Sequence, residues 1–352
     1  MSDGMTRREF LKLALLSAVS PRLLAACSGR SKPSVNFFNW STYIAKDTLP
    51  DFTRDTGIKV NYNVYADEEE MFAKLRSGAM SYDVIVGTDY MIDRLRSFNI
   101  ITPIPPGALK NRKNIMPIFR HPAYDPKGEY TAAYLWGTSG IGYNKNKIPK
   151  PPDSWRDLWS ERYAGKISML DNARDCVSLG LLLEGYPETT TDEKAYEKVK
   201  HLLIKQKPLV RSYTSSNYVD DLISGETWIS MAWSGDILQA LKENPELDYV
   251  IPREGSYRWV DNLCLVRGAP HPEDALRLMD YLLQGKVAAD IANTVRYASP
   301  NAAALPYLNP KLLKDPRAYP PPSVEKRLRF HAELDPVTVQ LWDETWSEVK
   351  VS

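Results

Sequence analysis

Hydrophobic and polar positions alternate with two different periods along the first third of the chain. Residues 35–40 and 57–64 read as strands, and residues 82–87 form a third, apolar strand that ends in glycine. We expect helices over 45–56 and over 68–77, where apolar residues recur at helical spacing. Strands that alternate with helices indicate βαβ units on a mostly parallel sheet, so the pattern predicts an α/β fold.

The middle of the chain has a different hydrophobic pattern, with two long β-prone segments. Residues 130–144 are extended, β-prone and interrupted by glycines, and residues 256–266 form a second long β-prone segment. We interpret both as crossovers between two lobes, because about 325 mature residues exceed what one hydrophobic core usually holds. The pattern predicts further strands at 165–170 and 227–233, and further helices at 155–159 with Ser154 as N-cap, 272–283, 285–294 and 337–349.

Polar and aromatic residues follow two of the predicted strands. Residues 39–43 (Asn-Trp-Ser-Thr-Tyr) end the first strand, and residues 87–90 (Gly-Thr-Asp-Tyr) end the third. In open α/β sheets ligands bind beyond the carboxyl ends of the strands. These two segments are therefore candidates for a binding site.

The N-terminal segment indicates export. Residues 6–12 hold twin arginines, residues 13–19 are apolar, and Leu24-Ala25-Ala26-Cys27 follows. The apolar run is far shorter than the roughly 20 residues of a membrane-spanning helix, and the chain has no other long apolar stretch. The segment resembles a twin-arginine export motif combined with a bacterial lipobox. We expect residues 1–26 to be a cleaved signal peptide, Cys27 to be lipidated, and residues 27–33 to tether the protein in the periplasm or at the outer face of the cytoplasmic membrane.

Charge, histidine and cysteine usage exclude several function classes. Lys and Arg number 45 against 44 Asp and Glu, so the chain lacks the basic excess that nucleic-acid binding normally requires. The four histidines show no paired ligand spacing, so we expect neither a metal nor a cofactor. Cys176 and Cys264 have no recognisable disulfide spacing, and we expect both to be free thiols.

Seven segments, in order, resemble the spermidine/putrescine-binding proteins of bacterial ABC importers. The resemblance covers about residues 35–350 and implies a two-lobed periplasmic binding protein fold, in which each lobe is a helix-flanked mixed sheet and the ligand cleft lies between them. We place the first lobe at 34–139 plus 260–306 and the second at 140–259 plus 307–352. The matching segments are 38–43, 56–60, 82–86, 154–159, 171–175, 259–261 and 297–301.

A polyamine is a methylene chain with an ammonium at each end. A site for it needs carboxylates for the ends and flat apolar faces for the middle, and aromatic rings add cation–π attraction. The resemblance implies an aromatic box, two polar contacts, two acids for the ammoniums, and an additional carboxylate near the C-terminal helix. In that order these residues are Trp40, Tyr90, Trp233, Trp259 and Tyr297; Ser41 and Thr88; Asp175 and Asp261; and Glu333.

The chain departs from the family pattern at one end of this site. Where the polyamine binders commonly have two adjacent acids, this chain has Asp171 and Asn172, and the acid after Arg174 is a shorter Asp175. Asn172 can still accept a hydrogen bond through its amide oxygen. The loss of one negative charge makes a triamine a less secure expectation than a diamine.

The expected function is capture of putrescine or spermidine for delivery to an inner-membrane permease driven by an ATPase, by a protein that acts as a monomer. A receptor for another cationic amine stays open. So does an exported carbohydrate-active enzyme, because Asp175, Asp261 and aromatic platforms would also suit a sugar. The sequence has no GxSxG, HExxH or phosphate-loop motif, so we expect no enzyme.

Overall fold

The computed structural model describes residues 33–78 and 80–352. The predicted signal peptide, the lipidation at Cys27 and most of the tether lie outside the described residues. Residues 34–352 form one compact unit. Among the described residues, no helix is both long and apolar enough to cross a membrane.

The described strands join into one mixed, eleven-stranded sheet, whose main path runs β2-β1-β3-β10-β5-β8-β6-β7. Strands β1, β2 and β3 run parallel, whereas β10 runs antiparallel to β3 and to β5. The strands are β1 Ser34–Trp40, β2 Lys59–Tyr65, β3 Val84–Thr88, β4 Ile101–Thr102, β5 Thr131–Asn144, β6 Ile167–Met169, β7 Val210–Tyr213, β8 Ile229–Trp233, β9 Leu247–Val250, β10 Ser256–Val266 and β11 Leu328–Phe330.

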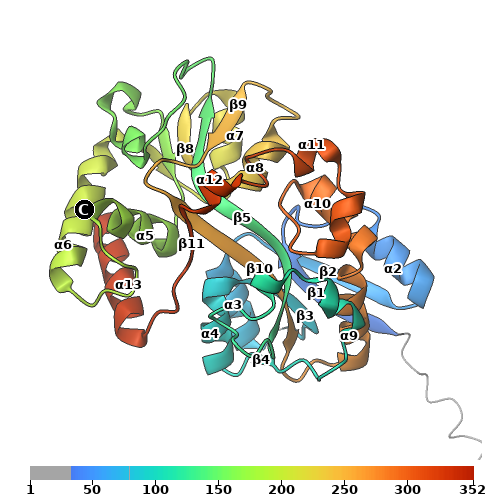
Figure 1. Ribbon diagram of the computed structural model, residues 1–352. Helices are drawn as coiled ribbons and strands as arrows, with labels where there is room; N and C mark the ends of the chain where they lie inside the picture. The colour runs from blue at the N-terminus through green and yellow to red at the C-terminus, as the bar shows by residue number, and fades with distance from the viewer. Residues whose placement is uncertain (1–32, 79) are drawn as a thin grey trace, which may run out of the picture. The chain divides into compact units, whose positions relative to one another are not determined.

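Helices flank the sheet throughout (Figure 1). They are α2 Thr48–Thr56, α3 Glu68–Ser77, α4 Asp89–Ser97, α5 Ala173–Glu184, α6 Glu193–Gln206, α7 Tyr218–Ser224, α8 Ser234–Ala240, α9 Pro272–Leu282, α10 Gly285–Val295, α11 Pro310–Leu313, α12 Pro322–Glu325 and α13 Pro336–Val351. The predicted helix at 155–159 is a 3₁₀ turn, and the predicted Ser154 cap is present as a capping box with Asp157.

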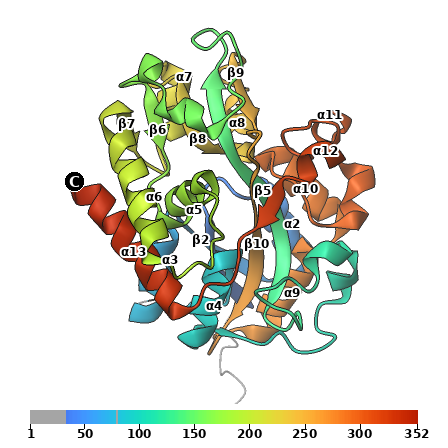
Figure 2. The same ribbon diagram turned by 60° about the vertical axis from the view of Figure 1, so that its left-hand side comes forward.

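Two long strands divide the sheet into two lobes. β5 pairs with β10 along its first half and with β8 and β9 along its second half. We call the part around β1, β2 and β3 the first lobe and the part around β6, β7 and β8 the second lobe. Figures 1 and 2 show β5 and β10 side by side between these parts. The two crossovers inferred from the sequence are therefore adjacent antiparallel strands.

Each lobe has its own apolar core. Phe37 and Val86 lie in the core of the first lobe, which α9 and α10 cover, and Ile229 and Leu179 lie in that of the second. Strands with buried side chains on both faces read as nearly continuous apolar runs, which explains why their positions followed from the pattern. Cys176 and Cys264 are both buried and free, as predicted.

Candidate ligand-binding site

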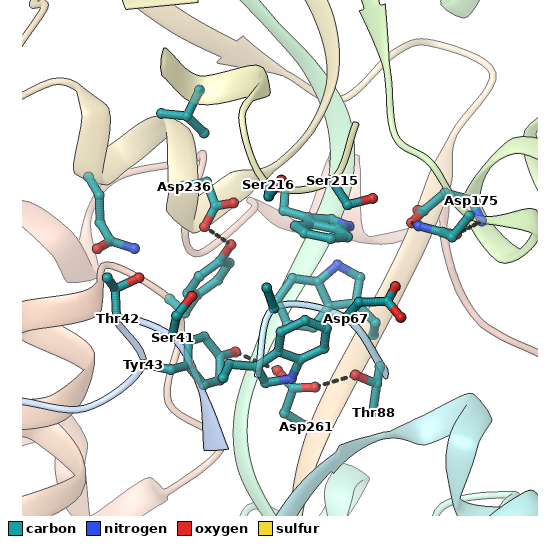
Figure 3. Close-up of a pocket in the computed structure, with 18 of the residues that line it drawn as sticks. Ser41, Thr42, Tyr43, Asp67, Thr88, Asp175, Ser215, Ser216, Asp236 and Asp261 are labelled. Atoms are coloured by element: carbon teal, nitrogen blue, oxygen red, sulfur yellow. Dashed lines mark hydrogen bonds between the residues drawn. The ribbon is translucent and has the colours of Figure 1, made fainter. Parts of the chain in front are cut away.

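A cavity of about 490 Å³ lies where the carboxyl ends of strands from both lobes converge. Trp40 ends β1, Thr88 ends β3 and Trp233 ends β8, and all three side chains line the cavity. The strand ends singled out in the sequence thus meet at one place. Figure 3 shows acids from different elements around this cavity.

Asp261 lies at the base of the cavity, on β10, where the pairing with β5 shifts register. Only 3% of the residue is exposed. Its carboxylate accepts hydrogen bonds from the Thr88 hydroxyl at 2.6 Å and the Tyr43 hydroxyl at 2.5 Å (Figure 3). Burial raises the pKa of Asp261 to about 7, although both hydrogen bonds favour the ionised form. A cation that enters the cavity would therefore meet a carboxylate that is ready to ionise.

Asp236 is a second acid in the cavity, which the sequence analysis missed. It lies in the first turn of α8 and accepts hydrogen bonds from the hydroxyls of Tyr297 at 2.5 Å and Tyr218 at 2.7 Å. Burial raises its pKa. Gly235 allows this arrangement, because a Cβ there would lie 2.4 Å from the Tyr297 ring. The only sequence signal was its place directly after β8, at a strand end.

Asp175 lies in the first turn of α5, apart from Asp236 and Asp261 (Figure 3). Its carboxylate accepts hydrogen bonds from the Ser139 hydroxyl at 2.8 Å and from the amide of Asn172 at 2.9 Å. Asn172 is also the N-cap, and its amide oxygen accepts from the backbone N–H of Asp175 at 2.7 Å. The amide at 172 therefore orients the shorter acid at 175.

Asp171 does not line the cavity. The Lys350 ammonium, on α13, lies 2.6 and 2.7 Å from its two carboxylate oxygens. Asp171 thus forms an ion pair with the C-terminal helix and does not face the ligand.

Aromatic rings from both lobes supply the apolar faces. Trp40 and Trp233 meet edge to face with ring centroids 6.4 Å apart, and Trp259 and Tyr297 meet in the same manner at 5.2 Å. Gly137 of β5 makes room for this second pair, because a Cβ there would lie 2.5 Å from the Trp259 ring. Flat rings that surround acids suit a ligand that is both cationic and partly apolar.

Glu68 is a further acid that the sequence analysis missed. It is the first residue of α3, after the N-cap Asp67, and both residues line the cavity. Its carboxylate accepts a hydrogen bond from the backbone N–H of Thr88 at 2.7 Å. Burial raises the pKa of Glu68 to about 8. A three-residue acidic run at the start of a helix is a common pattern of helix termini, so the sequence offered no signal that singled out Glu68.

The structure brings all the predicted site residues to the cavity except Glu333, which is exposed and lies beside Asp93 of α4. His331, two residues earlier, lines the cavity instead. Its ring stacks on Tyr257 with centroids 4.5 Å apart, and its Nδ1 lies 2.8 Å from a carboxylate oxygen of Glu188. This segment has no strong helical or strand period, so its register was not readable from the pattern.

Acids outnumber bases around the cavity. Its cationic side chains are Arg174 and Lys242, to which His331 adds a charge only when protonated. Such an excess of carboxylates, of which those of Glu68, Asp175 and Asp261 are buried, attracts cations and repels anions. Among the described residues no cluster of His, Cys, Asp and Glu has the composition of a metal site. The acids that line the cavity are Asp67, Glu68, Asp175, Asp220, Asp236, Glu243 and Asp261.

Comparisons with known proteins place the chain among related sequences and structures. The chain is 32% identical over 331 residues to the spermidine/putrescine-binding periplasmic protein of Escherichia coli K12, covering 93% of this chain and 94% of that protein. It is 31% identical over 360 residues to a putrescine/agmatine-binding protein of Pseudomonas aeruginosa, covering 97% and 98%. A solved structure from Listeria monocytogenes, described as a putative spermidine/putrescine ABC transporter, superposes with a TM-score of 0.84 at 29% identity, covering 90% of this chain and 98% of that one.

The family model described as bacterial extracellular solute-binding protein matches residues 48–320. That match spans most of both lobes and the strands that connect them. The chain therefore belongs to the bacterial extracellular solute-binding protein family.

Proposed function

We propose that this protein is the substrate-binding component of an ABC importer for polyamines. It captures putrescine or spermidine between its two lobes and presents the ligand to a membrane permease driven by an ATPase. The observation that carries the proposal is the acid Asp261, buried beneath aromatic rings and held by two hydroxyl donors. The names of the relatives support the ligand class.

The ligand's chemistry matches the positions of the side chains. One ammonium binds Asp261, where a charge-assisted hydrogen bond replaces lost hydration. The methylene chain lies against the rings of Trp40, Trp233 and Trp259, and the other ammonium reaches Asp175. Asp236 can hold a cation as well, because a carboxylate has more acceptor positions than its two tyrosine partners use.

A diamine fits this site better than a triamine. Asn172 stands where the family commonly has an acid, and Lys350 neutralises Asp171, so the end of the cavity near Asp175 has fewer free negative charges. A receptor for another cationic amine is the second candidate. Asn172 and the ion pair between Asp171 and Lys350 alter the end of the site that would select the chain length of the ligand. We propose no catalytic role for any residue and no cofactor.

The anchoring and the lobe limits are part of the proposal. Lipid on Cys27 would hold the monomeric protein at the outer face of the cytoplasmic membrane, after removal of residues 1–26. We propose that residues 34–139 plus 260–306 and residues 140–259 plus 307–352 move as two bodies that close on the ligand, with bending at β5 and β10.

Calorimetric titration of ligand-stripped protein with putrescine and spermidine tests the proposal. We expect wild type to bind at micromolar concentration or below. Asp261→Asn should cost about 2–5 kcal/mol, or roughly 30-fold to several thousand-fold in affinity, because it leaves a desolvated cation unpaired.

Asp171→Asn is the matched control, since it removes an acid of the same type that lies outside the cavity. Absence of binding by wild type to either amine would reject the polyamine assignment. Equal losses of affinity in Asp261→Asn and Asp171→Asn would show that the overall charge of the protein, and not Asp261, governs the affinity. Native mass spectrometry separates a receptor, which retains its solute, from an enzyme, which converts it.

A further inference from the structure

A second cavity, of about 210 Å³, lies beside the ligand cleft and has the opposite charge. It forms where α8, the end of α10 and α11 meet; Figures 1 and 2 show these helices side by side. Its floor is apolar and three cationic side chains surround it. The lining residues are Leu238, Leu241, Lys242, Arg296, Lys311, Leu312 and Asp315.

The three cations have no partner that neutralises them. Among the described residues, the side chains of Lys242, Arg296 and Lys311 form no hydrogen bond and no ion pair, and Arg296 has only a longer-range attraction to Asp315. Asp315 is engaged elsewhere, because Arg317 donates to its two carboxylate oxygens at 2.8 and 2.7 Å. The cavity therefore has uncompensated positive charge.

The backbone at Arg296 is a second, independent observation. Arg296 ends α10 with φ of 63°, in the left-handed region. Glycine or asparagine usually occupies this position of a helix, because a larger side chain costs roughly 1 kcal/mol there. Such strain in a non-glycine residue is a mark of functional sites. Here it places a guanidinium beside an apolar floor.

Lys242 connects the two cavities, since it lines both. Its positive charge at the edge of the acid-lined ligand cleft opposes a cationic ligand. An anion in the second cavity would attract the same ammonium away from the cleft. Binding at the two places is then coupled, and by linkage each ligand must strengthen binding of the other.

We propose that the second cavity binds a small dicarboxylate and that its occupancy raises the affinity of the cleft for its cationic ligand. The leucine floor favours an organic anion over inorganic phosphate, and the planar guanidinium of Arg296 suits a carboxylate in bidentate geometry. Lys311 pairs with the second carboxylate. The coupling, but not the anion site itself, rests on the function proposed above.

Calorimetric titration with succinate, at ionic strength held constant with sodium chloride, tests the anion site. Wild type should bind one succinate per chain. Arg296→Gly and Lys311→Gln should each lose about 10-fold or more in affinity, as expected for a hydrogen bond to a charged group. Lys314→Gln, at the end of α11 and outside the cavity, should bind as wild type does.

Arg296→Gly removes the guanidinium and relieves the left-handed strain together, so its unfolding temperature should not fall. Loss of succinate binding in this variant therefore cannot come from misfolding. Succinate binding that is absent in wild type, or unchanged in both Arg296→Gly and Lys311→Gln, would overturn the proposal. So would an equal response to chloride alone.

Putrescine titrations with and without saturating succinate test the coupling. We expect succinate to raise putrescine affinity about 5-fold or more, the low end of typical allosteric couplings. Lys242→Gln should raise putrescine affinity without succinate and abolish the effect of succinate. An unchanged putrescine affinity in wild type rejects the coupling. If putrescine does not bind at all, the proposed function fails, and the succinate titrations alone decide the anion site.

Discussion

The phenol oxygen of Tyr43 lies 2.5 Å from a carboxylate oxygen of Asp261, although 218 residues separate them in the chain. Tyr43 follows β1 and Asp261 lies on β10, so the contact joins the edge of the first lobe to a strand that crosses between the lobes. A hydrogen bond to a charged acceptor is short and directional. It holds the carboxylate in place before the ligand arrives.

Tyr43→Phe should weaken putrescine binding about 10-fold at pH 7. The variant removes a donor that favours the ionised carboxylate, and a hydrogen bond to a charged group contributes roughly 1.5–3 kcal/mol. Calorimetry at pH 7 and pH 9 measures the effect, which should shrink at pH 9, where Asp261 ionises regardless. Tyr143→Phe, which alters a buried tyrosine of β5 with no contact to Asp261, is the control. An affinity equal to that of wild type would rule out the role given to Tyr43.

Affinity for the cationic ligand should fall as the pH drops below about 7. The pKa of Asp261 is raised to about 7 by burial, and the ammonium needs the ionised form. Binding should level off toward pH 8, before the ligand's own ammoniums begin to lose protons, and should lose up to about tenfold per unit below pH 6. Calorimetry in two buffers of different ionisation enthalpy should also detect proton release at pH 7. A flat affinity between pH 6 and 8 would contradict this prediction.

The ligand-free protein should lose stability as the pH rises from about 4 to 8. The raised pKa values of Asp261 and Glu68 mean that the folded state binds more protons than the unfolded chain in this window. Each such group lowers the free energy of unfolding by up to about 1.4 kcal/mol per pH unit until its folded pKa is passed. Thermal unfolding at several pH values should show that the stability of Asp261→Asn depends less steeply on pH than that of wild type. Identical slopes would mean that Asp261 does not titrate in this range.

Asn172→Asp should destabilise the ligand-free protein and shift preference toward spermidine. The substitution replaces an amide donor, 2.9 Å from a carboxylate oxygen of Asp175, with a second carboxylate. Two acids this close resist joint ionisation, and a cation relieves the repulsion. The ratio of spermidine to putrescine affinity, measured by competition, should increase. A ratio equal to that of wild type would argue that this end of the cavity does not set chain length.

Cys27→Ser should release the mature protein from the membrane. Stable anchoring takes two lipid chains, and the substitution removes the thiol to which they would attach. Cell fractionation followed by immunoblotting measures the distribution. Cys176→Ser, which alters a buried thiol, should leave the protein in the membrane fraction. A Cys27→Ser protein that stays with the membranes would reject the lipobox interpretation.

Local pattern determined much of the framework. The strand at 35–40 and the helix at 68–77 formed close to the predicted bounds, because alternation and helical spacing are properties of neighbouring residues. The same holds for the two long crossovers, whose β-prone residues became β5 and β10. Trp40 and Thr88 could be placed at a site because carboxyl ends of parallel strands share one edge of a sheet.

Only the tertiary structure decided which acids face the cavity and in what state. Asp236 meets Tyr297, 61 residues away, and Lys350 reaches Asp171 across 179 residues. No local period encodes such pairings. The protonation of Asp261 and Glu68 depends on desolvation, which is set by everything packed around a carboxyl and not by its neighbours in the chain. The sequence pointed to Glu333, whereas the fold presents His331 to the cavity. An irregular segment has no period that fixes its register, so only the tertiary structure decided which of these residues faces the ligand.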